Sequence, residues 1–445
     1  MTLIRSQSVV TAFACFAVSL VNGAAAAAQT PTHPPTPVAR VRSGAPMSIG
    51  ALVERALTTA PTVRAAWSRV ESAKGDMTQA AARANPEVMT ERRDAFDGMN
   101  SQTAVGVTWP LELGRRSARA AVAVDGIAKA ALLATEAERQ VAARVKLAAI
   151  RALAADRLLA IATETVEAHQ QWCDLIEARV AEGAAAPIDR DVAEVELRQG
   201  LAMLTKLRAE SAARWAELNA AAGFDSTASF TLSETLEQAV AEVRRSPPAL
   251  MADALDARAD VAAAQAAVEI AEAKTSLARR EGGLDLSLNA TYMRTASGFP
   301  QMFMTPTGGM ASPENRMNEF VIGATIMWPW RNRNAGMVAA ATAEARTAEF
   351  ERDALLQTAQ AEASAAEIRD IEAGRGLEIY SNGLLTLAAK NRDVITESYA
   401  LGRVTRFEVI TEGRRFREVQ EAYVAALVEA FEARVMWTQA LGGSR

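Results

Sequence analysis

Apolar residues recur along this chain with two different periods. In long stretches they return every three or four positions, which is typical of helices, and in shorter stretches they alternate with polar residues, which is typical of strands with two unlike faces. The clearest alternation runs from Leu284 to Met293 and from Asn318 to Trp328. The predicted helices cover residues 49–84, 113–182, 188–222, 248–281, 337–401 and 405–441, and the predicted strands cover 87–96, 101–109, 284–293 and 318–328.

The longest predicted helix, residues 113–182, carries an apolar stripe with alternating spacings of four and three, as in a coiled coil. At 1.5 Å per residue it would span about 105 Å, so it needs neighbours along its whole length. The shorter helices 49–84 and 188–222 together have nearly that length, and we expect them to stack end to end beside it. His169 and Cys173 fall on the stripe, where packing is a more common role than ligand binding. The stripe consists of Val141, Val145, Ala148, Ala152, Ala155, Leu159, Ala162 and Val166, and continues through His169, Cys173, Ile176 and Val180.

The chain contains an internal repeat. Gly402 follows Gly183 by 219 positions in similar turns, and Trp328-Pro329 follows Trp109-Pro110 by the same 219 positions. Repeats of this kind indicate a duplicated structural unit. We therefore predict two copies of one order of elements: helix, strand, strand, long helix, helix. The predicted divisions are a first repeat over 49–222, an inter-repeat linker over 223–247, and a second repeat over 248–445 with a Gly- and Pro-rich insertion near 295–318.

The N-terminal residues have the pattern of a secretory signal. A basic residue, Arg5, precedes the apolar run Val9–Val21 and a small-residue zone that ends near Ala28. We predict a signal peptide over residues 1–28, followed by a Pro-rich segment over 29–48 that is expected to be poorly ordered. Cleavage would leave Cys173 as the remaining cysteine, so an internal disulfide is not expected.

Composition and motifs argue against several function classes. The formal net charge is −5, unlike the basic surface of a nucleic-acid-binding protein, and the sequence contains 2 histidines. It shows no nucleophile elbow, phosphate-binding loop or metal-ligand cluster, so we expect no enzyme activity, no catalytic residues, no cofactor and no metal site. A methionine-rich loop could bind soft Cu(I), but an exposed variable loop is the favoured interpretation. That loop contains Met302, Met304, Met310 and Met317, with Phe299 and Phe303.

The predicted strands have the length and end residues of a tilted transmembrane wall. Tyr292 and Phe320 would lie at one membrane interface, and Trp109, Trp328 and Trp330 at the other. A soluble hairpin with one buried face remains the alternative, and charges in strand 87–96 leave neither of its faces apolar. Four strands cannot close a barrel, and a bilayer tolerates no open strand edge. Hairpins that span a membrane would therefore require several copies of the chain.

The ordered set of motifs resembles the TolC-type outer-membrane efflux family, and the resemblance covers nearly the whole mature chain. It rests on the turns 183–189 and 399–408, the junction WPLELGRR at 109–116, and the closing pairs Ala222-Gly223 and Leu441-Gly442. The junction resembles that of the heavy-metal, CzcC-like branch. The resemblance implies a mainly α fold, with four strands per chain that complete a 12-stranded outer-membrane β-barrel in a homotrimer, and a long periplasmic α-helical barrel.

The resemblance also implies a function and partners. The protein would be a passive exit duct for metals or drugs in a tripartite system, with a periplasmic adaptor (membrane fusion protein) and an inner-membrane RND-type pump. An outer-membrane channel for type I protein secretion and a periplasmic coiled-coil adaptor or scaffold are the alternatives. Asp189 and Glu408 would form a pore constriction, or else cap helices, since Thr405-x-x-Glu408 is a capping box. The turns that would contact the adaptor contain Gly183, Ala184, Ala185 and Ala186 in the first repeat and Gly402, Arg403, Val404 and Thr405 in the second.

Overall fold

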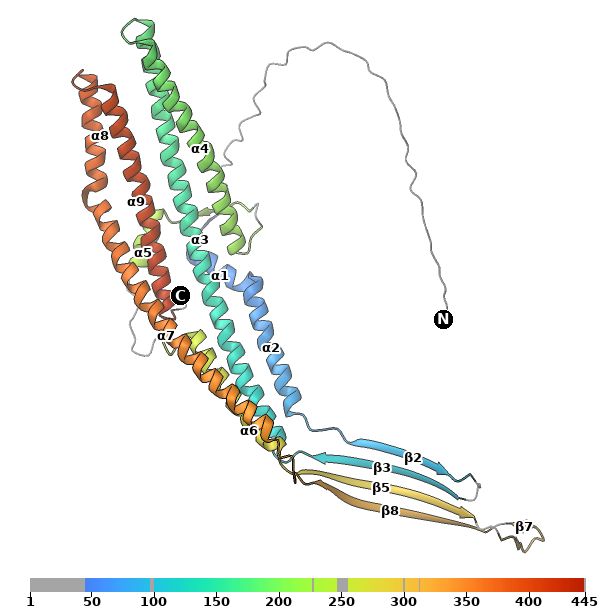
Figure 1. Ribbon diagram of the computed structural model, residues 1–445. Helices are drawn as coiled ribbons and strands as arrows, with labels where there is room; N and C mark the ends of the chain where they lie inside the picture. Colours follow the sequence, from blue (N-terminus) through green and yellow to red (C-terminus); the bar gives the residue numbers. More distant parts are fainter. Residues whose placement is uncertain are drawn as a thin grey trace, which may run out of the picture. The chain divides into compact units, whose positions relative to one another are not determined.

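The computed structural model describes residues 45–96, 100–225, 228–245, 255–298, 301–311 and 313–443. This part of the chain is mainly helical, with a sheet at one end (Figure 1). The predicted signal peptide and residues 29–44 lie outside the described residues. The helices are α1 (Ile49–Thr59), α2 (Pro61–Ala81), α3 (Arg115–Ala181), α4 (Pro187–Ala221), α5 (Leu236–Arg244), α6 (Ala259–Glu281), α7 (Ala335–Ile379), the π-helical η1 (Tyr380–Leu384), α8 (Leu385–Ala400) and α9 (Arg406–Ala440). The strands are β1 (Pro46–Met47), β2 (Glu87–Asp94), β3 (Asn100–Leu111), β4 (Thr231–Leu232), β5 (Asp285–Gly298), β6 (Phe303–Met304), β7 (Met310–Ala311) and β8 (Glu314–Met327).

The longest helix, α3, runs from the sheet to the opposite end of the helical part (Figure 1), about 100 Å at 1.5 Å per residue. α2 packs beside it near Ala134, close to the sheet, and α4 packs beside it near Val145 and beyond. This arrangement confirms the expected stacking of shorter helices along one long helix. Most of the predicted stripe from Val141 to Ala162 is buried, with Ala148 and Leu159 half-buried, and its many alanines let neighbouring helices approach closely.

The helix predicted over 49–84 is wrong in one respect, because it is divided at Ala60. Pro61 has no amide hydrogen and its ring disfavours a helical conformation in the preceding residue. Ala60 accordingly adopts an extended conformation with ψ of 125°, and α2 starts anew with Pro61 in its first turn.

The helix predicted over 337–401 is also interrupted. The segment η1 separates α7 from α8, and Gly383 adopts a φ of 149° that residues with a Cβ rarely reach. Residues 248–254 of the helix predicted over 248–281 lie outside the described residues, and α6 begins at Ala259, after a turn over 255–258. Tertiary contacts fix that start: the buried guanidinium of Arg258 binds the carboxylates of Asp260 and Glu362 and donates to the last carbonyl of α9, that of Ala440.

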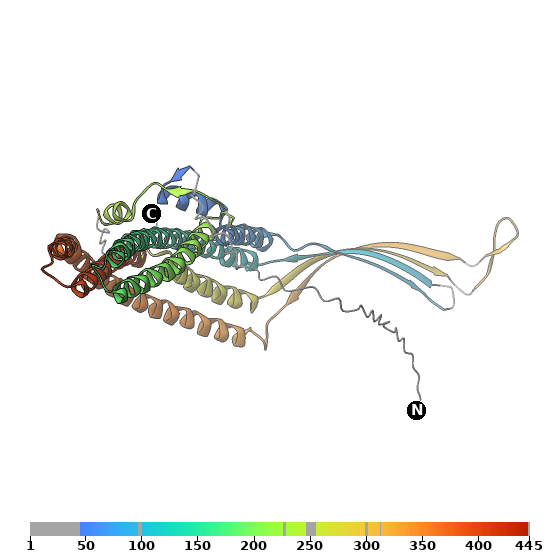
Figure 2. The same ribbon diagram turned by 90° about the horizontal axis from the view of Figure 1, so that it is seen from above.

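The main sheet has the order β2-β3-β5-β8, with every neighbouring pair antiparallel. Its strands extend from one end of the helices (Figure 2). β5 and β8 continue further than predicted into the Gly- and Pro-rich insertion, where β6 and β7 form a small hairpin. Cross-strand pairing in both hairpins and between them stabilises this longer sheet, which the local composition alone does not indicate.

Residues 223–247, expected to act as a linker, contain packed structure. β4 pairs in parallel with β1, so residues 46–47 of the Pro-rich segment are held in a small sheet. α5 starts with a capping box in which Thr235 and Gln238 exchange hydrogen bonds, and it buries Leu236, Ala239 and Val240 against α3 and α9. The region therefore forms part of the core at mid-length of the helices.

A buried ion-pair cluster joins α5, α7 and α9 beside this core. Asp370 of α7 accepts hydrogen bonds from Arg434 of α9 at 2.9 Å and from Arg244 of α5 at 2.9 Å. Arg244 also donates to the carbonyl of Ala430. Gly374 leaves the space that the Arg244 side chain occupies, since a Cβ there would lie 2.2 Å from Arg244 Nη2.

Candidate functional site

The sheet has one apolar face and one polar face, and both are accessible in the single chain. The register places the alternating apolar residues of all strands on the same side, because directly paired residues of antiparallel strands share a face. Ile322 is 75% exposed and Phe320 is 67% exposed. The opposite side carries mostly small or polar residues such as Gln102, Asn289 and Thr325. The apolar face consists of Val88, Val105, Val107, Trp109, Leu286, Leu288, Ala290, Tyr292, Phe320, Ile322, Ala324 and Ile326.

The aromatic residues lie at different heights on the apolar face. Tyr292 pairs directly with Phe320, so these two share one level. Trp328 is eight residues from Phe320, about 26 Å along an extended strand, which corresponds to a height of about 20 Å in a wall tilted by about 40°. Trp109 pairs with Leu288, and Leu288 with Ala324, so Trp109 lies midway between the two levels. Trp328 and Trp330 follow the end of β8, and their location at a water interface stays a prediction.

Charges in β2, which made its faces hard to interpret from the sequence, are paired near the end of the hairpin. Arg92 Nε lies 2.8 Å from Asp94 on the apolar side, and Arg93 Nε lies 2.6 Å from Glu91 on the opposite side. The register puts Arg92 two positions beyond the level of Tyr292 and Phe320. These charges therefore lie outside the segment between the aromatic levels.

The two helix–helix turns expected at the tips have the same geometry. In the first, Gly183 adopts a φ of 74° and the amide of Ala184 donates to the carbonyl of Arg179 at 2.8 Å. In the second, Gly402 adopts a φ of 69° and the amide of Arg403 donates to the carbonyl of Ser398 at 2.9 Å. A left-handed glycine followed by a residue whose amide makes this bond is a common helix C-terminal cap. We refer to residues 183–186 and 402–405 as the tip turns.

The two acidic residues beside the tip turns have different partners. Asp189 accepts a hydrogen bond from the amide of Ala186 and forms an ion pair with Arg406, the first residue of α9. Glu408 accepts hydrogen bonds from the amide and hydroxyl of Thr405, at 2.6 and 2.8 Å. These bonds to Thr405 hold the pKa of the exposed Glu408 carboxyl below its ordinary value. Among the described residues Glu408 makes no ion pair, so its charge is directed to solvent.

The sequence did not reveal Arg406 as the partner of Asp189, nor a second pair, Arg414 with Glu196, further along the same two helices. Both pairs join α4 to α9. The acids are seven positions apart on α4 and the arginines eight apart on α9, so each set returns to nearly the same helix face. That spacing is the signal that could have predicted a charged contact between the two helices.

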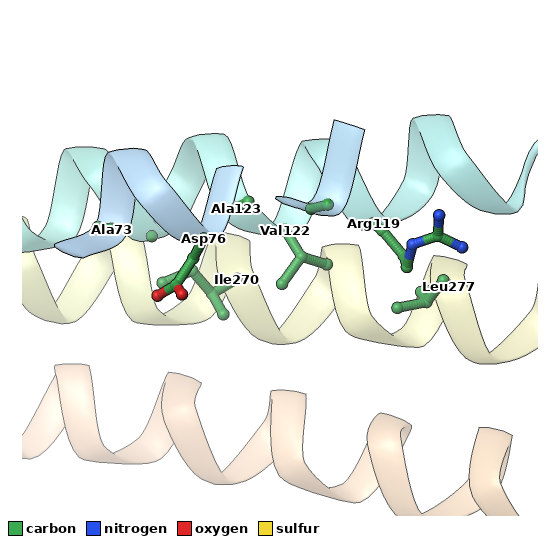
Figure 3. Close-up of a pocket in the computed structure, with 9 residues that line it drawn as sticks. Ala73, Asp76, Arg119, Val122, Ala123, Ile270 and Leu277 are labelled. Carbon is green, nitrogen blue, oxygen red and sulfur yellow. The ribbon is translucent and has the colours of Figure 1, made fainter. Parts of the chain in front are cut away.

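A hollow of about 380 Å³ lies nearer the sheet, between α2, α3 and α6. Figure 3 shows Val122, Ile270 and Leu277 between α3 and α6, with Asp76 and Arg119 at the same hollow. Arg119 is already paired with Glu112, and the remaining lining is mainly alanine and glycine. The hollow presents no convergent set of polar groups that indicates chemistry.

The other residues considered as ligands in the sequence lie in environments that indicate no binding site. His169 and Cys173 are half-buried on α3, and burial lowers the pKa of the His169 imidazole. Met304 and Met310 form a cross-strand pair in the exposed β6–β7 hairpin, and Phe299 lies outside the described residues. Within the described ranges, no group of three or more His, Cys, Asp or Glu side chains is placed to hold a metal, and no helix has the length and apolarity needed to cross a membrane.

Comparison with known proteins connects this geometry to a family. Residues 52–224 match the sequence model of the family described as outer membrane efflux protein. The cobalt-zinc-cadmium resistance protein CzcC of Cupriavidus metallidurans is 24% identical over 425 residues, which cover 91% of this chain and 92% of CzcC.

Solved structures show the same fold. The structure of CusC, described in connection with transmembrane channel formation, aligns with a TM-score of 0.73 and 17% identity, over 92% of this chain and 98% of that chain. The open-state MtrE outer membrane channel of Neisseria gonorrhoeae aligns with a TM-score of 0.73 and 16% identity, over 89% of each chain. The strands, long helices and paired turns are thus those of an outer membrane channel fold.

Proposed function

We propose that the chain belongs to the outer membrane efflux protein family and forms a homotrimeric channel that acts as the passive exit duct of a tripartite efflux system. As a member of that family it is an outer-membrane protein with a periplasmic helical part, and it is a channel protein rather than an enzyme. The division into two repeats over 49–222 and 248–445 is part of the proposal.

The observation that supports the proposal is the main sheet, which has an exposed apolar face and a polar face on its opposite side. Its edge strands β2 and β8 have no partner strand on their outer edges within the described chain. In a bilayer, every strand edge must be paired. Three copies with four strands each would close a wall of twelve, with the apolar face toward lipid and the polar face toward water. The soluble-hairpin alternative would leave the apolar face in contact with water.

The proposed protein partners are inferred from the tip turns, at the end of the helices opposite the sheet. The tip turns expose short, polar-capped helix ends that a periplasmic adaptor could contact, and the adaptor would connect the channel to an inner-membrane RND-type pump. The similarity to CzcC, a cobalt-zinc-cadmium resistance protein, favours divalent metal cations as the substrate, with drugs as the alternative. In the proposed system the channel is a passive duct, so the choice of substrate would be made by the pump.

We place the cation preference of the periplasmic mouth on Glu408 rather than on Asp189. Arg406 offsets the charge of Asp189, whereas Glu408 is bound by neutral donors and keeps its full negative charge at neutral pH. Three symmetric copies would bring the Glu408 carboxylates into a ring, which attracts cations and repels anions.

Two neighbouring substitutions test the channel directly. Ile322→Arg places a charge on the apolar face, and Val321→Arg places the same charge on the opposite face at nearly the same depth. A lipid-facing arginine near the bilayer midplane costs about 2–4 kcal/mol, so Ile322→Arg should reduce the amount of trimer in outer-membrane fractions. Val321→Arg should assemble normally and alter single-channel conductance in planar bilayers. Equal behaviour of the two variants, or extraction of a soluble monomer, would contradict the proposal.

A further inference from the structure

A cavity of about 330 Å³ lies between the two helical hairpins, on the sheet side of the tip turns. Its walls come from four helices: α3, α4, α8 and α9. It lies beside the pair of Arg414 with Glu196, one of the two ion pairs that join α4 to α9. A molecule in this cavity would therefore contact both hairpins at once.

The walls of the cavity are largely apolar. Ile161 of α3 and Val409, Ile410 and Phe416 of α9 contribute hydrocarbon and aromatic surface. Gly413 faces open space, since a Cβ at this position would meet no atom within 4 Å. A cavity of this size and lining fits a small flat apolar body, such as one or two fused aromatic rings.

The polar groups of the cavity include both acceptors, such as the Glu164 and Glu196 carboxylates, and donors, and two of the donors make no hydrogen bond within the described residues. Arg417 forms a long ion pair with Glu421, at 3.6 Å, which is beyond hydrogen-bond distance and leaves its guanidinium donors open to a further acceptor. Trp172 lines the cavity, and its Nε1 is buried without a hydrogen-bond partner in the described part of the chain. Arg414 and Arg392 are occupied by Glu196 and Asp393. An acceptor on the ligand would complete the arrangement at Arg417.

We propose that this cavity binds a small aromatic carboxylate, with its ring against the apolar lining of α3 and α9 and its carboxylate accepting from Arg417. A planar carboxylate matches the planar guanidinium better than a single hydroxyl does, because it can accept two parallel bonds. The bound ring would contact α3 and α9 together and resist changes in their spacing. Binding itself does not depend on the proposed channel function, whereas its effect on conductance rests on that function.

Binding can be measured by titration calorimetry on the full-length protein in detergent, with indole-3-acetate as the probe. Tryptamine carries the same ring with a cationic group and serves as the matched probe. We expect indole-3-acetate to bind at least about tenfold more tightly, the effect of one charge-assisted hydrogen bond. Equal binding of the two probes, or no binding of either, would overturn the proposal.

Substitutions locate the site. Gly413→Leu should fill the cavity and abolish binding of indole-3-acetate, while Gly75→Leu, at an open helical glycine on α2, should leave it unchanged. Arg417→Gln should weaken binding about tenfold, with Arg415→Gln as the control at an arginine outside the cavity lining. Normal binding by Gly413→Leu would place the probe elsewhere and refute the site.

A conductance measurement separates this inference from the proposed function. If the wild type conducts in planar bilayers, indole-3-acetate should change its open probability, and Gly413→Leu should be insensitive to the probe. Binding without any conductance by the wild type would leave the site in place and refute the channel. Conductance without binding would refute the site and leave the channel in place.

Discussion

Acid–arginine pairs join helices in two regions of this molecule, and the two regions differ in burial. At mid-length of the helices, Asp370 is 2% exposed and is bound by Arg434 and Arg244. Near the tip turns, Asp189 and Arg406 have side chains that are 31% and 26% exposed. Water screens the second pair and competes for its hydrogen bonds, whereas the side chains of Asp370 and Arg434, at 3% and 8% exposure, are largely shielded from water. Similar side chains therefore fix the structure in one place and allow adjustment in the other.

The surrounding packing strengthens this contrast. At mid-length, α5, α3 and α9 share an apolar core that includes Ile150, Leu427 and Phe431. Toward the tips, α4 and α9 are joined by two ion pairs beside a cavity. If the proposed channel opens at its periplasmic mouth, its hairpins must move at the tips while their bases stay fixed, and this distribution of contacts would allow that.

The largest effect expected is that of Asp370→Ala compared with Asp189→Ala. Removing Asp370 leaves two arginines without their main partner in a largely buried site, which typically costs about 3–5 kcal/mol. Removing Asp189 should cost about 0.2–1 kcal/mol, as for other partly exposed pairs. Thermal unfolding of the detergent-extracted protein, followed by circular dichroism at one scan rate, checks the difference. Equal shifts in the two midpoints would show that burial does not separate the two regions.

A smaller effect is expected for Gly374→Ala. The added Cβ would displace Arg244 from Asp370, and loss of that contact should destabilise the protein by about 1–3 kcal/mol. Gly376→Ala, two residues along α7 where a Cβ meets open space, should be neutral or slightly stabilising because alanine favours a helix. In an Arg244→Gln background, Gly374→Ala should have little further effect in the same melting experiment. A full additional loss there would mean that the glycine is needed for another reason.

The tip pair should affect gating more than stability. Asp189→Ala and Arg406→Ala remove the same ion pair, and each should raise the open probability in planar bilayers by about 1.5- to 5-fold per copy, the equivalent of an exposed ion pair. Reversing the pair, as Asp189→Arg with Arg406→Asp, should restore closure, and Asp191→Ala serves as the control. Raised salt should mimic the single variants because it screens the pair. Failure of the reversed pair to restore closure would remove it from the gate.

The smallest effect concerns Glu408 and pH. Its folded-state pKa lies below the ordinary value of about 4.3, so its contribution to the first turn of α9 is present above that value and is lost as the pH falls through the lower folded-state pKa. Amide hydrogen exchange at residues 406–409 should therefore lose protection under acid conditions. Glu408→Gln should remove this pH dependence and also lower the cation preference of the channel. An unchanged ion preference would place selectivity on another residue.

Local patterns predicted much of the architecture. The period of apolar residues located α3, α4 and α9 to within a few residues, because long helices and their caps are specified by nearby side chains. Pro61 also indicates a helix break from the sequence alone, since proline disfavours a helical conformation in the residue before it. The prediction of one continuous helix arose because the apolar period continues on both sides of Pro61. The alternation in β5 and β8 indicated the two sheet faces in the same local way.

The sequence by itself determined the helices, the strand faces, the two tip turns and the family resemblance. The tertiary structure decided which charges meet: Arg406 with Asp189, Arg414 with Glu196, and Arg244 with Asp370 across 126 positions. It also decided the height of Trp109, the start of α6 and the cavity between the hairpins. The physical reason is that propensity and periodicity act over a few residues, whereas ion pairs, register and cavities depend on how distant segments pack.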